Sequence, residues 1–277
     1  GVQTCALPIL SVGIIGAGNV GSRVEKKARA LGMRVVLNDP PLARQTGEPK
    51  YRPLDEVFDC DIVTCHTPLT RQSEAPDPTF HLAGPDFFTR LKPGAIFCNA
   101  GRGEVVDERA LHAAIDAGRL RAVVLDVWEN EPRIDAALLR KVDIATPHIA
   151  GYSYDGKING TVMIYEAACR FLGAAPAWDA RRAMAAPEFP ELRVEAAGRG
   201  DEDVLREAVT RVYPIERDDA ALRATTALAP DERGRQFDRQ RKEYPYRREF
   251  HNTRLISEGA SPSLIESMQS VGFQTQR

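Results

Sequence analysis

The feature that most constrains the fold of this chain is the glycine-rich run Val12-Gly13-Ile14-Ile15-Gly16-Ala17-Gly18-Asn19-Val20-Gly21. It is followed by a second apolar run that ends at Asp39. A strand, a glycine turn, a helix, a second strand and an acid, in that order, are typical of a dinucleotide site. Gly16 would make the tight turn, Gly18 would let the backbone approach a pyrophosphate, and Gly21 would let the helix pack on the sheet. The predicted cofactor contacts are Gly16, Gly18, Asn19, Val20, Gly21 and Asp39, and a plain tight turn is the alternative.

Short apolar runs alternate with helical patterns through the first half of the chain. The runs that could form buried parallel strands are 11–15, 34–38, 61–65, 94–99, 122–127 and 143–146. Helical spacing separates most of them, for example between Asp107 and Gly118. The pattern predicts an α/β fold with a doubly wound parallel (Rossmann) sheet, whose ligand crevice lies beyond the carboxyl ends of the strands.

Three chemically useful side chains follow different predicted strands. Arg102 follows the fourth strand, Glu131 the fifth and His148 the sixth. This set resembles the D-isomer-specific 2-hydroxyacid dehydrogenases, in which an Arg-Gly, a Glu-Pro and a Pro-His carry the catalytic trio. The resemblance implies that Arg102, Glu131 and His148 are catalytic. Arg102 and Tyr152 would bind substrate, and Thr67, Asp126 and Gly151 would contact the cofactor.

The chemistry expected of the trio is specific. Oxidation of a 2-hydroxy acid needs a base whose pKa lies near the working pH, and the imidazole of His148 would supply it. Glu131 would fix the tautomer of that imidazole, and Arg102 would hold the substrate carboxylate. Glu129 is the alternative partner for the histidine.

Each of these residues also has a plain structural interpretation. His148 could be a hydrogen-bonded structural histidine, whereas Arg102, placed between two glycines, suits either close ligand approach or an exposed turn. Thr67 and Asp126 could instead be strand-end caps.

The composition excludes several classes of partner. A formal net charge of −2 gives no electrostatic reason to expect nucleic acid or an anionic membrane. No apolar stretch approaches the roughly 20 residues needed to span a bilayer. The five cysteines are odd in number and lack CxxC spacing, which favours reduced thiols in a cytoplasmic protein. No metal site is expected.

Longer stretches narrow the resemblance to one branch of the family. These stretches are Asn38-Asp39-Pro40-Pro41, Asp126-Val127-Trp128-Glu129-Asn130-Glu131-Pro132, the eleven residues from Pro147 to Lys157, Arg217-Asp218-Asp219-Ala220 and Tyr246-Arg247-Arg248-Glu249. The branch implies NAD-dependent oxidation of 4-phospho-D-erythronate to 2-oxo-3-hydroxy-4-phosphobutanoate, a step in making pyridoxal 5′-phosphate, by a homodimer formed through a C-terminal domain. An enzyme of the 3-phosphoglycerate type and a non-catalytic NAD-binding fragment remain alternatives.

The resemblance also predicts the domain organisation. Residues 1–10 form an atypical tail, 11–153 the NAD-binding domain, 154–190 a connecting helix and linker, and 191–277 a smaller α+β dimerisation domain. Family members begin with roughly a hundred residues of substrate domain that this chain does not resemble, so poor turnover is expected. The arginine-rich stretch 233–248 contains interleaved acids and is interpreted as a solvated helix face rather than a nucleic-acid site.

Overall fold

The computed structural model describes residues 10–73, 75–180 and 184–276, and the chain divides into two compact units. The first unit comprises Gly1–His148 and Glu216–Lys242, and the second comprises Ile149–Ile215 and Glu243–Arg277. Most of the predicted tail at 1–10 lies outside the described residues.

The first unit is built on a six-stranded parallel sheet in the order β2-β1-β3-β4-β5-β6. The strands are β1 Ser11–Ile15, β2 Arg34–Asn38, β3 Ile62–Cys65, β4 Ala95–Asn99, β5 Leu120–Leu125 and β6 Ile144–Ala145. This arrangement confirms the predicted doubly wound sheet. β5 begins two residues before the predicted run, because Leu120 already pairs with Ala95 across an irregularity in the ladder. The strand order reverses between β1 and β3, which is where such sheets bind their ligands.

Short helices connect these strands. They are α1 Gly21–Ala30, α2 Pro40–Thr46, α3 Pro85–Arg90, α4 Glu108–Asp116 and α5 Ala136–Lys141, with the 3₁₀ turns η1 Leu54–Glu56 and η2 Gly103–Val105. Aspartates cap three of the helices, because the carboxylates of Asp39, Asp107 and Asp135 each accept a backbone N–H of the first turn. The predicted helix after Asp107 therefore begins where the sequence pattern placed it.

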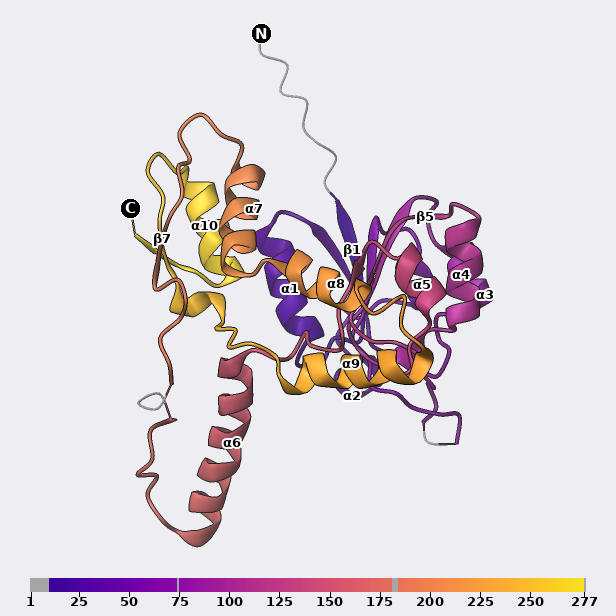
Figure 1. Ribbon diagram of the computed structural model, residues 1–277, viewed down its shortest axis with the longest axis horizontal. Helices are drawn as coiled ribbons and strands as arrows, with labels where there is room; N and C mark the ends of the chain where they lie inside the picture. Colours follow the sequence, from indigo (N-terminus) through magenta and orange to yellow (C-terminus); the bar gives the residue numbers. More distant parts are fainter. Residues whose placement is uncertain (1–9, 74, 181–183, 277) are drawn as a thin grey trace. The chain divides into compact units, whose positions relative to one another are not determined.

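Two helices from late in the sequence, α8 Ile215–Arg223 and α9 Pro230–Lys242, belong almost entirely to the first unit. Arg223 donates to the carbonyl oxygens of Leu139 and Val142 at 2.6 and 2.7 Å. The carboxylate of Asp219 accepts the N–H of Ala145 at 2.7 Å and so covers the edge of β6. These contacts hold residues 216–242 on the six-stranded sheet of the first unit (Figure 1). From the sequence, these residues were expected in a C-terminal domain formed by 191–277.

The arginine-rich stretch 233–248 also differs from what was expected, which was a solvated helix face. Arg233 is buried and donates to the carbonyl oxygens of Ile134 and Leu228, both at 3.0 Å. In the second unit, Arg248 makes a two-pronged ion pair with the buried carboxylate of Asp155. These side chains are bound internally, so the stretch is in part a set of structural anchors and not simply a solvated helix face.

The second unit contains a three-stranded parallel sheet in the order β7-β8-β9. Its elements are α6 Tyr154–Leu172, β7 Glu191–Arg193, α7 Asp201–Val212, η4 Phe250–Asn252, β8 Arg254–Ile256, α10 Pro262–Val271 and β9 Gln274–Gln276. Ser153 caps α6 by accepting the N–H of Gly156 at 3.1 Å, so this helix begins at the first residue of the expected connecting segment 154–190. Near the C-terminal end of α6, Phe171 is 90% exposed and Leu172 74% exposed. Within the described residues, none of the helices is sufficiently long and apolar to span a bilayer.

Candidate active site

The glycine turn after β1 has one open position and two crowded ones. Gly16 has φ +87°, and a Cβ there would lie 2.9 Å from the backbone of His66 and Thr67. A Cβ on Gly21 would lie 2.0 Å from the carbonyl oxygen of Gly16, so the helix can pack this closely only with glycine. A Cβ on Gly18 would meet no described heavy atom within 4 Å. Gly18, Asn19 and Val20 are all exposed, which leaves the turn accessible to a ligand.

Asp39 ties the turn to the following helix. Its carboxylate accepts the N–H of Ala17 at 2.9 Å through one oxygen and the N–H of Leu42 at 3.0 Å through the other. Each carboxylate oxygen can accept more than one hydrogen bond. The half-buried Asp39 is thus held in place with capacity for a hydroxyl donor, as a ribose would provide.

At the end of β3, two buried polar atoms have no hydrogen-bond partner among the described residues: Nδ1 of His66 and Oγ1 of Thr67. Burial lowers the pKa of His66 to about 4, so its imidazole is neutral at physiological pH. The backbone of His66 and Thr67 lies beside the Gly16 turn, at the reversal of strand order. Together with the open Gly18 position and the fixed Asp39 carboxylate, they fit a dinucleotide.

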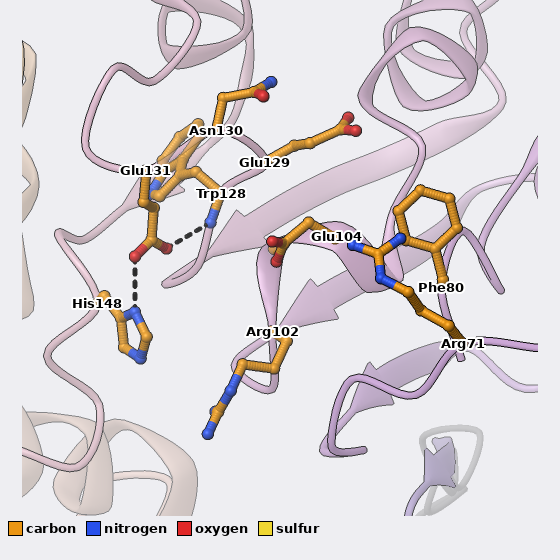
Figure 2. Close-up of a pocket in the computed structure, with 10 residues that line it drawn as sticks. Arg71, Phe80, Arg102, Glu104, Trp128, Glu129, Asn130, Glu131 and His148 are labelled. Atoms are coloured by element: carbon orange, nitrogen blue, oxygen red, sulfur yellow. Dashed lines mark hydrogen bonds and ion pairs between the residues drawn. The ribbon is translucent and has the colours of Figure 1, made fainter. Parts of the chain in front are cut away.

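His148 and Glu131 form a direct pair. Nδ1 of His148 lies 2.8 Å from Oε2 of Glu131, and the other carboxylate oxygen accepts the N–H of Trp128 at 2.8 Å (Figure 2). The backbone N–H of His148 donates to the carbonyl oxygen of Asp126 at 2.6 Å, while its side chain is 30% exposed. His148 therefore has a fixed backbone and an accessible ring.

Arg102 lies on a turn that is braced from within. The buried side chain of Asn99 donates to the carbonyl oxygen of Arg102 at 2.9 Å and accepts the N–H of Gly101 at 3.1 Å. A Cβ on Gly103 would lie 1.8 Å from the carbonyl oxygen of Trp128, so this glycine admits the neighbouring loop rather than a ligand. The Arg102 side chain itself is exposed. The brace by Asn99 was not anticipated from the sequence.

One cavity of about 380 Å³ brings the trio together. Its lining residues are Arg71, Phe80, Arg102, Gly103, Glu104, Trp128, Glu129, Asn130, Glu131 and His148. Figure 2 shows these side chains gathered from the loops that follow the strands. The cavity holds cationic and anionic groups side by side, as a site for a charged, hydroxylated molecule requires.

The remaining predicted residues lie in different places. Asp126 is buried, and its carboxylate accepts the hydroxyl of Thr146 at 2.6 Å. Gly151 and Tyr152 belong to the second unit, where Gly151 is exposed. There the ring of Tyr152 packs edge-on against Tyr244, and the ammonium group of Lys157 lies 4.1 Å from the centre of the Tyr152 ring.

Glu108 is a buried acid beside the cavity that the sequence did not reveal. It is 8% exposed and accepts the N–H of Glu129 at 2.8 Å. Burial, with the neighbouring Glu129 carboxylate adding to it, raises the pKa of Glu108 to about 8. The sequence signal was an acid at the first position of α4, which helix capping alone would also explain.

Comparison with known proteins places the chain in a family. Residues 6–150 match the family model for the D-isomer specific 2-hydroxyacid dehydrogenase, NAD binding domain, and residues 184–272 match a domain of unknown function, DUF3410. The chain belongs to the D-isomer-specific 2-hydroxyacid dehydrogenase family. Among the described residues, no group of three or more His, Cys, Asp or Glu side chains is arranged to hold a metal ion.

Named relatives identify the branch. The chain is 44% identical to the erythronate-4-phosphate dehydrogenase of Citrobacter koseri, over 97% of this chain and 68% of the relative. It is 41% identical to that of Marinobacter nauticus, over 96% of this chain and 69% of the relative. A solved D-isomer specific 2-hydroxyacid dehydrogenase from Lactobacillus delbrueckii ssp. bulgaricus, in an NAD-complexed form, matches with a TM-score of 0.50 and 28% identity, over 61% of this chain and 56% of that one. The chain thus spans about two thirds of the curated relatives and just over half of the solved one.

Proposed function

We propose that this chain carries the cofactor-binding and proton-transferring part of an NAD-dependent dehydrogenase that oxidises 4-phospho-D-erythronate to 2-oxo-3-hydroxy-4-phosphobutanoate. The observation that carries the proposal is the His148–Glu131 pair, which shares one cavity with Arg102. The names of the relatives supply the substrate, and the branch supplies the place of the reaction in pyridoxal 5′-phosphate synthesis.

NAD would lie along the turn after β1. The backbone at Gly18 would approach the pyrophosphate, Asn19 and Val20 would flank it, and Asp39 would accept ribose hydroxyl hydrogen bonds. Thr67 would supply a hydroxyl to the same ligand, and Asp126 and Gly151 complete the proposed contacts. When bound, NAD accepts the hydride that leaves C2 of the substrate.

His148 would act as the base in this reaction. As the C2 hydroxyl becomes a carbonyl, its proton passes to Nε2 of His148, while Glu131 keeps the ring in the Nδ1–H tautomer and stabilises the imidazolium. Arg102 would grip the substrate carboxylate and polarise the forming carbonyl. Tyr152 is the further proposed substrate contact.

The test is NADH formation by the chain with 4-phosphoerythronate, 3-phosphoglycerate or D-lactate as substrate, beside calorimetric binding of NAD. NADH formation that is fastest with 4-phosphoerythronate and lost in His148→Gln would support the proposal. A higher rate with 3-phosphoglycerate would reassign the substrate. Tight NAD binding with no turnover of any of these acids would favour a non-catalytic cofactor-binding role.

We further propose that the second unit forms a homodimer in the cytoplasm. In its favour, Ile164 and Phe171 on α6 are 74% and 90% exposed, which is unusual for large apolar side chains left without a partner. The free state of Cys60, Cys65, Cys98 and Cys169 suits a reducing compartment.

Light scattering tests the homodimer. Ile164→Glu combined with Phe171→Glu should lower the mass from two chains to one. Leu228→Glu, a matched change on an exposed leucine of the first unit, should not. A monomeric unmodified chain would remove the proposal.

A further inference from the structure

The side chains of Glu129 and Glu131, both on the loop from Trp128 to Glu131, point in opposite directions. Glu131 points to His148, whereas Glu129 points to the far side of the cavity (Figure 2). There Oε1 of Glu129 lies 2.9 Å from Nε2 of His81. The cavity region therefore contains two carboxylate–imidazole pairs whose acids are two residues apart on one loop.

The Glu129 side of this loop is fastened to α4 through a reciprocal contact. The N–H of Glu129 donates to Oε1 of Glu108 at 2.8 Å, and the N–H of Glu108 points back to Oε2 of Glu129 at 3.4 Å. Glu108 is the first residue of α4, and its buried position gives this contact a rigid base. Main chain and side chain of Glu129 are thus both held from outside the loop.

His81 is itself fixed. Its N–H donates to the carbonyl oxygen of Glu104 at 2.8 Å, and its ring stacks on Phe80 with the ring centres 4.0 Å apart. His81 therefore offers Glu129 a partner that cannot easily follow the loop if the loop moves.

Within the part of the chain that the structure describes, His148 is the only hydrogen-bond partner of the Glu131 carboxylate that lies outside this loop. One oxygen of this carboxylate accepts the N–H of Trp128, which lies in the same loop, so this contact fixes Glu131 only as well as Trp128 itself is held. The indole of Trp128 donates to the carbonyl oxygen of Thr146 at 3.0 Å and holds the start of the loop. The middle of the loop is held by the hydrogen bonds of Glu129 with Glu108 and His81.

We infer that Glu108, Glu129 and His81 form a loop anchor that positions Glu131 against His148 and thereby sets the tautomer of the His148 ring. The inference rests on the proposed roles of Glu131 and His148. The members of the anchor are positioning residues that act through Glu131. A carboxylate beside Nδ1 favours the tautomer that carries the proton on Nδ1, so loosening the loop should weaken that preference.

The charges in the anchor are compatible with this role. Two ionised carboxylates held so close together would repel each other. Burial keeps the Glu108 carboxyl largely protonated at neutral pH, since its pKa is raised to about 8. The anchor therefore closes with little repulsion between its two acids.

The test is ¹⁵N nuclear magnetic resonance of the histidine rings in the full chain, with His148→Gln used to assign the His148 signals. In the unmodified chain, neutral His148 should be mainly the Nδ1–H tautomer. In Glu129→Ala, the population of the Nε2–H tautomer should rise several-fold. Glu129→Gln should restore the unmodified spectrum, because an amide can still bond to His81 and to the N–H of Glu108.

The control is Glu104→Gln, which removes a charge from the same cavity and leaves the three anchor side chains in place. It should not change the tautomer population. A Glu129→Ala spectrum identical to that of the unmodified chain would overturn the inference. Equal shifts in Glu129→Gln and Glu129→Ala would also overturn it, because charge rather than anchoring would then be the cause.

A second variant covers the case in which Glu129→Ala does not fold. His81→Asn shortens the side chain and tolerates the positive φ of 51° at this position. It should raise the Nε2–H population in the same direction, and no change would count against the anchor. Since turnover is not read, the outcome is separate from that of the proposed function.

Discussion

Nδ1 of His148 lies 2.8 Å from the Glu131 carboxylate, so the nitrogen left to meet a ligand is Nε2. A carboxylate accepts but does not donate when ionised, which requires the imidazole to carry its proton on the side that faces Glu131. The lone pair of Nε2 is then available to take a proton from a hydroxyl.

Loss of either member of this pair should reduce turnover of 4-phosphoerythronate by different amounts. We expect His148→Gln to lower kcat by roughly 10² to 10⁴, since the proton acceptor is removed. Glu131→Gln should cost about 10 to 10³, because the base remains but its tautomer and charge are less well supported. Calorimetric affinity for NAD should stay within about twofold in both variants. Near-normal kcat in His148→Gln would contradict the assignment of the base.

Two glycines of the turn after β1 should separate binding from stability. Gly18→Ala places a methyl group in open space, so the free energy of unfolding should hardly change, while NAD affinity should fall by at least about tenfold through a clash with the pyrophosphate. Gly21→Ala forces a methyl group against the carbonyl oxygen of Gly16 and should cost about 1–3 kcal/mol of unfolding free energy. Urea unfolding and calorimetry check the two effects. Equal NAD affinity in Gly18→Ala and the unmodified chain would remove the turn from the cofactor site.

Asp39 should determine the preference for NAD over NADP. A carboxylate repels a 2′-phosphate, and Asp39→Asn removes that charge while its side-chain oxygen can still accept the N–H of Leu42. We expect the ratio of NADP to NAD affinity to rise by about tenfold, measured by calorimetry with both cofactors. Asp55→Asn, an exposed acid in η1, is the control and should leave the ratio unchanged. Tighter binding of NADP than of NAD by the unmodified chain would refute the role given to Asp39.

The buried acid Glu108 should make stability depend on pH. Its pKa rises from 4.5 to about 8 on burial, so between these values the folded chain keeps a proton that the unfolded chain has lost. The unfolded state then binds fewer protons, and the free energy of unfolding falls as the pH rises through this window. Glu108→Gln, which cannot ionise, should flatten that part of the curve in urea unfolding measured across the window. Parallel curves for the variant and the unmodified chain would show that Glu108 is not the group responsible.

The sequence predicted the sheet well because strands buried on both faces are read from apolar runs alone. β1 and β2 have the predicted bounds, and Asp107 caps α4 as expected. The spacing of residues could not decide whether Glu129 or Glu131 is the partner of His148, because the two acids are only two residues apart. In the folded chain Glu131 contacts His148, while Glu129 contacts His81.

Contacts between distant segments were beyond the reach of sequence patterns. The two glycines around Arg102 suggested room for a ligand, yet the space beside Gly103 is taken by the backbone of Trp128. Arg233 belongs to the stretch that was interpreted as a solvated helix face, but it donates to the carbonyl oxygen of Ile134, 99 residues away. Arg223 likewise donates to the carbonyl oxygen of Leu139, 84 residues away. Partners of this kind depend on tertiary packing, which periodicity does not encode.

The first unit is completed by α8 and α9, whose Leu222 and Phe237 enter its core after an intervening stretch that belongs to the second unit. During synthesis, a growing chain that has passed His148 still lacks these two side chains and the Asp219 cap on β6. The first unit can therefore finish folding only after residue 242 has left the ribosome. Until then the edge of β6 is unpaired and part of the apolar core is exposed. A stop codon near residue 172 would accordingly give an aggregation-prone product rather than a free-standing nucleotide-binding domain.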